Sequence, residues 1–331
     1  MTKKQLFNRL INSQTIDRVL FNPILMHFAA RFAGKSYGEF ASDYKVLVHS
    51  NILAMEHFDT DMVGLISDPY RETAAFGAKV SFPAEEVPRC EEIIVNTIDD
   101  VKALKNPDVY KNPRTFDRIK GAELFQKELK GEIPVIGWIE GPLAESCDLS
   151  GLSNMLFQLM VDPDFSNFLL DKCTVTAKEF AKAQIDAGCE IIGMGDAICS
   201  QIDLNSYNTY IKERHCEIVN FIHENGAKVK VHICGNITHL LPSLAELPID
   251  ILDIDSMVDM QSAIEILGPD IICCGNINPV FILNKTAEEV EISCRELISK
   301  EKGRKFILSG GCEICVDTPV KNLLAMRTAS L

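Results

Sequence analysis

The fold is decided by five short apolar segments in the second half of the chain, which are CEIIGMGD (189–196), KVKVHIC (228–234), IDILDID (249–255), DIICCGN (270–276) and RKFILS (304–309). Each segment has the length of a strand rather than a helix. Between them lie longer segments with helix start and stop signals. Strands that alternate with helices in this way are typical of a parallel β-sheet.

The helices between these strands are predicted from their capping residues. Asp162-Pro163 predicts an N-cap followed by proline at the first helical position, and Gly188 ends that helix. Thr286 and Glu289 have the spacing of a capping box, in which each side chain bonds a free backbone N–H of the other residue. Asp259 is expected to cap a shorter helix.

The first half of the chain supplies three further strands, at Val19–Met26, Asp61–Ser67 and Pro134–Glu140. Eight strand–helix units favour an α/β fold of the TIM (β/α)8 barrel type over an open doubly wound sheet. No G-x-G-x-x-G or Walker A pattern follows any of the strands, which disfavours nucleotide binding. We expect one domain over residues 1–331, with an N-terminal helical segment at about 1–18.

Composition excludes several classes of function. The chain has 331 residues, 47% of them hydrophobic, and a formal net charge of −14. This charge argues against nucleic-acid binding and against electrostatic docking on anionic lipid. The longest stretch without charged residues, Ile271–Asn284, is too short to cross a membrane. Residues 1–10 lack the apolar core of a signal peptide, so we expect a cytoplasmic protein.

Twelve cysteines are too many to share one role. In a reducing cytosol, disulfides are disfavoured and most cysteines should be small core residues. The sequence must therefore show which few of them do chemistry.

The strongest chemical signal is His232-Ile-Cys234, which ends a predicted strand. Side chains two residues apart on a strand point to the same face, so the imidazole and the thiol would face the barrel mouth together. This pair suits zinc. A core cysteine beside a hydrogen-bonded histidine is an equally good interpretation of these three residues alone.

Two neighbouring strands add further candidate ligands. Asp253 and Asp255 share one face of the next strand, and a carboxylate that points inward requires a metal or a cationic partner. Cys312 follows two glycines at the end of the last strand, where a parallel barrel brings all carboxyl ends to one opening. His232, Cys234 and Cys312 would be three zinc ligands. The fourth position would be left for Asp255, water or substrate.

The other cysteines are given structural roles. Cys315 forms a C-x-x-C with Cys312 but lies past the strand end, so we expect it to be structural. Cys273 and Cys274 are adjacent on a strand and face opposite sides, so they cannot both be ligands. The remaining seven show no partner pattern and are expected to be packing residues.

Motifs through nearly the whole chain resemble the uroporphyrinogen decarboxylase superfamily, and within it the zinc-containing, corrinoid-dependent methyltransferases. The motifs are Leu65-Ile-Ser-Asp68 with Phe76-Gly77, Gly137-Trp-Ile-Glu-Gly-Pro142, Gly195-Asp196, His232-Ile-Cys-Gly235, Gly275-Asn276, Gly310-Gly-Cys-Glu-Ile314, Thr318-Pro319 and Ala325-Met326. The resemblance implies a TIM barrel. In the methyltransferase branch the His-x-Cys and the distant Cys are the zinc ligands, which correspond here to His232, Cys234 and Cys312.

The resemblance also implies a reaction and a partner. A methyl group would pass between a corrinoid (methylcobalamin) and a small substrate such as a thiol, tetrahydrofolate, a methylamine or a methyl ether. By similarity to zinc methionine synthases, Asp255 stands where a carboxylate ligand lies. The chain has no D-x-H-x-x-G cobalamin motif, so the corrinoid is expected on a separate protein that docks over the barrel mouth. The sequence leaves homo-oligomerisation, the substrate and the direction of transfer open.

Two alternatives remain open. The first is a metal-free decarboxylase of the uroporphyrinogen type, in which the counterpart of Asp68 binds pyrrole N–H groups. The arginine-rich segment of those enzymes corresponds here to residues 27–34, which contain only Arg31. The second is a non-catalytic family member.

Three further acidic residues, Asp68, Glu140 and Asp196, lie near strand ends. They would orient the substrate or shuttle protons there. The equally good alternative is that each is a helix cap or a loop carboxylate.

Overall fold

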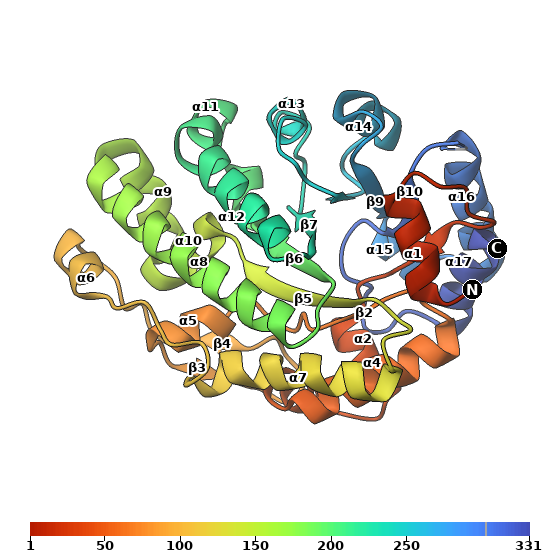
Figure 1. Cartoon of the computed structure of the whole chain (residues 1–331), viewed down its shortest axis with the longest axis horizontal. Helices are drawn as coiled ribbons and strands as arrows, with labels where there is room; N and C mark the ends of the chain where they lie inside the picture. Colours follow the sequence, from red (N-terminus) through yellow and green to blue (C-terminus); the bar gives the residue numbers. More distant parts are fainter. Residues whose placement is uncertain (302) are drawn as a thin grey trace.

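The structure, a computed structural model, describes residues 1–301 and 303–331. Eight parallel strands form one curled sheet in the order β1-β10-β9-β8-β7-β6-β5-β2, with helices around its outside (Figure 1). The strands are β1 (Leu20–Phe21), β2 (Val63–Gly64), β5 (Val135–Glu140), β6 (Ile191–Gly195), β7 (Lys228–His232), β8 (Ile251–Ile254), β9 (Ile272–Ile277) and β10 (Phe306–Gly310). Each lies within or overlaps a predicted strand, which confirms the eight-stranded barrel.

The two end strands, β1 and β2, are joined by one aspartate rather than by a ladder of strand hydrogen bonds. The backbone N–H of Asp61 donates to the carbonyl of Phe21 over 2.8 Å, and its carboxylate accepts a bond from the Phe21 N–H over 2.7 Å. The Arg18 guanidinium pairs with the same carboxylate. Asp61 thereby satisfies the backbone groups that a missing strand neighbour would leave unpaired, and it closes the barrel.

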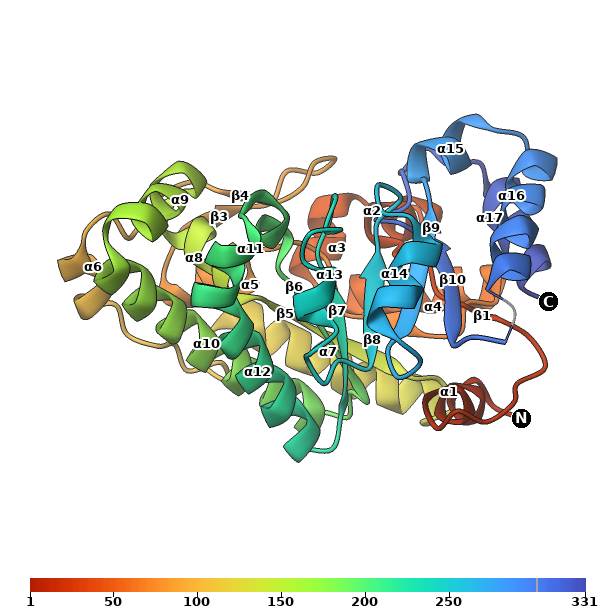
Figure 2. The same ribbon diagram turned by 90° about the horizontal axis from the view of Figure 1, so that it is seen from above.

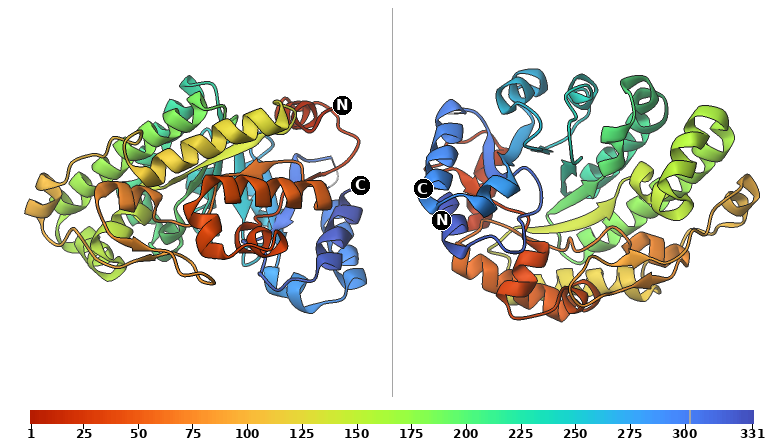
Figure 3. Two further views of the ribbon diagram at one scale, coloured as in Figure 1. Left: turned by 90° about the horizontal axis from the view of Figure 1, so that it is seen from below. Right: turned by 180° about the vertical axis from the view of Figure 1, so that it is seen from behind.

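The helices lie around the outside of the curled sheet (Figures 1 and 3). They are α1 (Lys3–Ile11), α2 (Met26–Phe32), α3 (Tyr37–Ser42), α4 (Tyr44–Phe58), α5 (Arg71–Phe76), α6 (Ile98–Ala103), α7 (Pro113–Leu129), α8 (Pro142–Ser150), α9 (Leu152–Val161), α10 (Pro163–Asp186), η1 (Ala197–Gln201), α11 (Leu204–Ser206), η2 (Tyr207–Ile211), α12 (Lys212–Glu224), α13 (Leu241–Leu244), α14 (Met260–Leu267), α15 (Pro279–Asn284), α16 (Ala287–Lys300) and α17 (Val320–Ser330).

The predicted caps lie where the sequence places them. Asp162 accepts a bond from the N–H of Phe165 at the start of α10, and Asp259 accepts one from Ser262 at the start of α14. Thr286 and Glu289 form the full capping box of α16. These local signals fix the lengths of the helices that return the chain to the start of each next strand.

A small antiparallel pair, β3 (Val80–Ser81) with β4 (Arg89–Cys90), lies outside the barrel and was not predicted. Its strands are only two residues long, and Pro83 and Pro88 lie in the connection. So short a run carries no readable alternation of polar and apolar residues.

Helix α1 closes the lower end of the barrel, as Figure 2 shows on the side opposite α15. Leu6, Phe7 and Leu10 belong to one buried cluster with interior residues of the barrel such as Ile136 and Trp138. Polar contacts hold the helix in place, including a bond from the Lys4 N–H to the carbonyl of Glu132, just before β5. The predicted N-terminal helical segment is therefore a plug for the barrel interior.

No helix within residues 1–301 and 303–331 is long and apolar enough to cross a bilayer.

The plug predicts a specific loss of stability. Phe7 is 2% exposed, so we expect Phe7→Ala to lower the free energy of unfolding by about 3–5 kcal/mol, the usual cost of truncating a buried phenylalanine. Urea unfolding followed by circular dichroism would measure it. Phe157→Ala on α9 is the control, because Phe157 is 59% exposed and should change little. Equal losses in the two variants would contradict the plug.

Candidate metal centre

Strand register brings His232 and Asp253 side by side at the barrel mouth. They are direct partners between β7 and β8, and both lie at or near the carboxyl ends of these strands. Two residues beyond His232, Cys234 follows on the same side of the chain. The mouth of a parallel barrel is where functional side chains gather, so this placement agrees with the sequence-based prediction.

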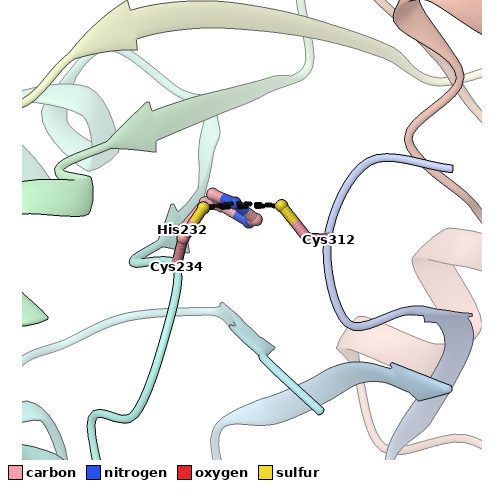
Figure 4. A group of neighbouring side chains, drawn as sticks. All are labelled: His232, Cys234 and Cys312. Carbon is pink, nitrogen blue, oxygen red and sulfur yellow. Dashed lines mark hydrogen bonds between the residues drawn. The ribbon is translucent and has the colours of Figure 1, made fainter. Parts of the chain in front are cut away.

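His232, Cys234 and Cys312 point toward one another across the mouth (Figure 4). His232 Nε2 lies 2.8 Å from Cys234 Sγ and 3.9 Å from Cys312 Sγ, and the two sulfurs are 3.5 Å apart. Ligands of a tetrahedral zinc, bound at about 2.0–2.3 Å, lie about 3.5–3.8 Å from one another. The sulfur–sulfur distance and the distance from Nε2 to Cys312 Sγ are close to that range. The shorter distance, from Nε2 to Cys234 Sγ, is that of a hydrogen bond.

Two close approaches of the backbone bring the sulfurs together. A side chain at Gly311 would lie 2.4 Å from the backbone nitrogen of Ser256, so only glycine lets the segment after β10 pass this near the end of β8. Gly235 follows Cys234 with a φ of 93°, in the left-handed region that favours glycine. Glycine is therefore required beside each thiol, at Gly311 by the close approach of two backbone segments and at Gly235 by its positive φ.

The protons of the site are shared between the imidazole and the thiols. Burial by itself lowers the pKa of His232, but hydrogen bonds with Asp253 and Cys312 outweigh it and raise that pKa to about 10. The hydrogen bond between the sulfurs lowers the pKa of Cys312 to about 4 and raises the pKa of Cys234. A protonated imidazole thus lies beside the Cys312 thiolate, at the point where a metal ion would replace protons.

Asp255 does not join this group. Its carboxylate accepts bonds from the backbone N–H groups of Gly235 over 2.9 Å and Met257 over 3.0 Å. It also lies outside the set of donor atoms that are within 4.8 Å of one another. In this conformation Asp255 holds the turn after Cys234, and its role as a fourth ligand stays a prediction.

Asp68 and Glu140 lie in a second, strongly charged part of the site. Asp68 accepts a bond from Arg114 Nη2 over 2.6 Å, and Arg71 Nη2 donates to Glu140 Oε1 over 2.7 Å. Burial raises the pKa of Asp68, but the neighbouring arginines, Arg114 foremost, lower it to about 2. Neither Arg71 nor Arg114 was predicted from the sequence.

Buried acids outnumber their partners around Arg71. Glu72 and Glu140 both lie beside this guanidinium, at 3.6 and 2.7 Å. Burial raises the pKa of Glu140 and of Glu72, with Arg71 opposing it in both. Burial also raises the pKa of Asp148 to about 8. A carboxyl with a pKa near 8, such as that of Asp148, holds its proton at neutral pH, and perturbed pKa values are typical of functional sites.

Asp196 is wholly buried under α8. Its oxygens accept bonds from the N–H groups of Leu143 and Ala144 in the first turn of that helix, and one of them lies 2.9 Å from His215 Nε2. His215 in turn contacts the Tyr207 hydroxyl over 3.1 Å. With Cys199, Asp196 and His215 form a second compact group of potential ligand atoms. The contacts of Asp196 with backbone and histidine fit the helix-capping alternative.

The other cysteines agree with packing roles. All twelve are free thiols, and Cys273 and Cys274 are each 1% exposed within β9. Cys315 is partly exposed and does not belong to either group of potential ligand atoms in the described residues.

Comparison with known proteins places the chain in a family. A family model described as uroporphyrinogen decarboxylase (URO-D) matches residues 2–330. The chain belongs to this family. It is 25% identical over 280 residues to a uroporphyrinogen decarboxylase of Geobacter metallireducens, covering 80% of this chain and 78% of the relative.

Relatives of a second kind are equally similar. The methylcobamide:CoM methyltransferase MtbA of Methanosarcina mazei is 28% identical over 235 residues, which cover 70% of this chain and 68% of that protein. The fold matches a solved methyltransferase from Methanosarcina mazei with a TM-score of 0.90 at 18% identity, over 100% of this chain and 98% of the other. The family therefore includes both decarboxylases and methyltransferases, and the site must distinguish them.

The Asp68–Arg114 pair predicts a pH-dependent stability. We expect Asp68→Asn to destabilise the protein by about 3 kcal/mol at pH 6, because it leaves a largely buried guanidinium without its carboxylate. The pKa of Asp68 is about 2 in the folded protein and about 3.9 in an unfolded chain. The contribution of the Asp68 carboxylate to the free energy of unfolding is therefore complete above pH about 4, and it is lost as the pH falls toward 2.

Urea unfolding of the wild type and of Asp68→Asn, each at pH 6 and pH 3, would test this prediction. Exposed Asp108, which pairs with Lys111 on the surface, gives the control Asp108→Asn. A difference between wild type and Asp68→Asn that does not shrink at pH 3 would contradict the assignment.

Proposed function

We propose that the chain is a zinc-dependent methyltransferase that moves a methyl group between a corrinoid and a small substrate. The observation that carries this proposal is the convergence of His232 Nε2 with the sulfurs of Cys234 and Cys312 at the barrel mouth. One imidazole and two thiolates with an open fourth position are the ligand set of a catalytic zinc. Methyl transfer from or to a corrinoid is the activity named for the MtbA relative.

The donor set fits zinc by its chemistry. Nitrogen and thiolate sulfur are the ligands that zinc prefers, and Asp253 holds the far nitrogen of the His232 ring over 2.9 Å. When bound, zinc would supply Lewis acidity to the sulfur, nitrogen or oxygen of the substrate.

The protein's own groups would bind and orient the substrate. Glu140 lies at the end of β5, two strands from His232 in the sheet, and Arg71 holds it over 2.7 Å. Asp68 is fixed by Arg114 and by the Ser67 hydroxyl over 2.6 Å each. We assign these paired groups to the polar part of the substrate. Asp148, whose pKa is raised to about 8, would exchange protons with it.

A metal-free decarboxylase is the second candidate, since several relatives carry that name. Such an enzyme needs free cations for the many carboxylates of its substrate. Arg31, the single arginine of segment 27–34, is instead bound to Asp317 over 2.5 Å and lies 3.8 Å from Glu85. A single arginine in this segment supplies little positive charge for a substrate with many carboxylates, which favours the methyltransferase.

The corrinoid is assigned to a separate protein that docks over the mouth. A cobalt-bound methyl group must reach the trio, and the trio lies at the open ends of the strands (Figure 4). The substrate would be a small molecule such as a thiol, tetrahydrofolate, a methylamine or a methyl ether.

Metal content tests the site directly. We expect elemental analysis of the purified protein to give one zinc per chain, and Cys312→Ala to lose the metal on dialysis against a chelator, because it removes one of three ligands. Cys315→Ala is the matched control, since this neighbouring thiol lies outside the ligand group, and it should keep its zinc. Full zinc occupancy in Cys312→Ala would contradict the three-ligand site.

Methyl transfer tests the activity. Loss of the methylcobalamin absorbance would be followed with thiols and tetrahydrofolate as acceptors. The reverse reaction, formation of methylcobalamin from cob(I)alamin, would be followed with methylamines and methoxyarenes as donors. We expect one of these to react and Cys312→Ala to be slower by about 100-fold or more, because a Lewis acid contributes several kcal/mol. Decarboxylation of a porphyrinogen without zinc would support the second candidate. Bound zinc without any transfer would indicate a non-catalytic member.

A further inference from the structure

A lysine lies inside the barrel, directly behind the metal centre. Lys230 precedes His232 by two residues on β7, and its side chain is only 3% exposed. A buried ammonium group is costly unless it is paired. Its salt-bridge partner among the described residues is Asp253, whose Oδ1 lies 3.0 Å from Nζ.

Asp253 divides its two oxygens between two partners. Oδ1 faces Lys230, and Oδ2 accepts a bond from His232 Nδ1 over 2.9 Å. Burial raises the pKa of Asp253, but Lys230 and His232 outweigh it and lower that pKa to about 2. With one partner on each oxygen, the carboxylate cannot rotate without losing a buried hydrogen bond.

The orientation of this carboxylate decides which histidine nitrogen faces the sulfurs. Because Nδ1 donates to Asp253, Nε2 is the atom that lies 2.8 Å from Cys234 and 3.9 Å from Cys312. A carboxylate that turned away would release Nδ1 and free the ring to rotate. Partners of this kind behind a histidine ligand commonly change metal affinity by about 10–100-fold when they are removed.

We propose that Lys230 is a positioning residue of the metal centre, which holds Asp253 in the orientation that presents His232 Nε2 to the metal. This inference rests on the proposed zinc site. It assigns to the lysine a hydrogen-bonding role through Asp253, with no contact to the metal or the substrate.

The same strand offers a matched control. Lys228 lies two residues before Lys230 and pairs with Asp250 over 2.9 Å. Each of the two lysines therefore forms an ion pair with its own aspartate. The Lys228 side chain is 41% exposed and lies at the start of β7, away from the mouth. A general effect of losing a lysine from this strand would appear in both variants.

The test measures zinc affinity by competition with a chelating indicator, together with the visible spectrum of the cobalt(II)-substituted protein. We expect Lys230→Met to weaken zinc binding by about 10-fold or more and to shift the cobalt d–d bands. Lys228→Met should leave both unchanged. Lys230→Gln, which can still donate a hydrogen bond to Asp253, should restore most of the affinity. Wild-type affinity and spectrum in Lys230→Met, or an equal loss in the Met and Gln variants, would overturn the proposal.

A double-mutant comparison keeps the test decisive if Lys230→Met does not fold. Lys230→Met combined with Asp253→Asn removes both buried charges, and the proposal requires this double variant to bind zinc as well as Asp253→Asn alone. Losses that add would overturn it, because a residue that acts through Asp253 cannot matter once that carboxylate is gone. Failure of the wild-type protein to bind zinc would instead refute the proposed function, so the two outcomes are distinct.

Discussion

The barrel is closed between β1 and β2 by one residue, Asp61, rather than by a ladder of strand hydrogen bonds. Asp61 bonds both backbone groups of Phe21, so the first and second strands meet although each is only two residues long. Strand β10 pairs with β1 on one side and is three strands from β7 on the other, and the segment after it turns over the mouth. Cys312 then reaches Cys234, 78 residues earlier in the chain, with 3.5 Å between the sulfurs. The proposed metal centre therefore depends on the order of strands β7 to β10 in the sheet rather than on any one strand.

Buried charges are the second constraint on this barrel, and two buried ion pairs link neighbouring elements. Lys230 and Asp253 compensate one another on adjacent strands, and Arg71 links α5 to Glu140 at the end of β5. Such pairs are weak evidence for stability, because desolvation offsets most of their attraction. Lys230 and Asp253 do favour one register of β7 and β8, since a shift would separate them and leave two unpaired charges inside the barrel.

Much of this could be predicted from the sequence, because alternation along a strand fixes the face on which a side chain lies. His232 and Cys234 share a face by that rule, and Asp253 was expected to have a metal or cationic partner. The rule also places Lys230 on the same face as His232, so its role could have been inferred. Arg71 and Arg114 could not, because they come from helices whose orientation depends on packing across the mouth. Asp255 shows the limit of the rule, since the backbone turn after Cys234 binds its carboxylate.

The two halves of the mouth differ in charge, and the difference has a chemical reason. The trio of nitrogen and sulfur ligands comes from β7 and the segment after β10, while Arg71, Arg114, Asp68 and Glu140 come from α5, α7, the segment after β2 and the end of β5. A guanidinium near two thiolates would compete with a metal ion for their negative charge. On the proposed function, separation of the arginines from the sulfurs would leave the thiolates to the metal and the ion pairs to the polar part of a substrate. A substrate that spans the mouth would then be oriented by charge at one end and would react at the other.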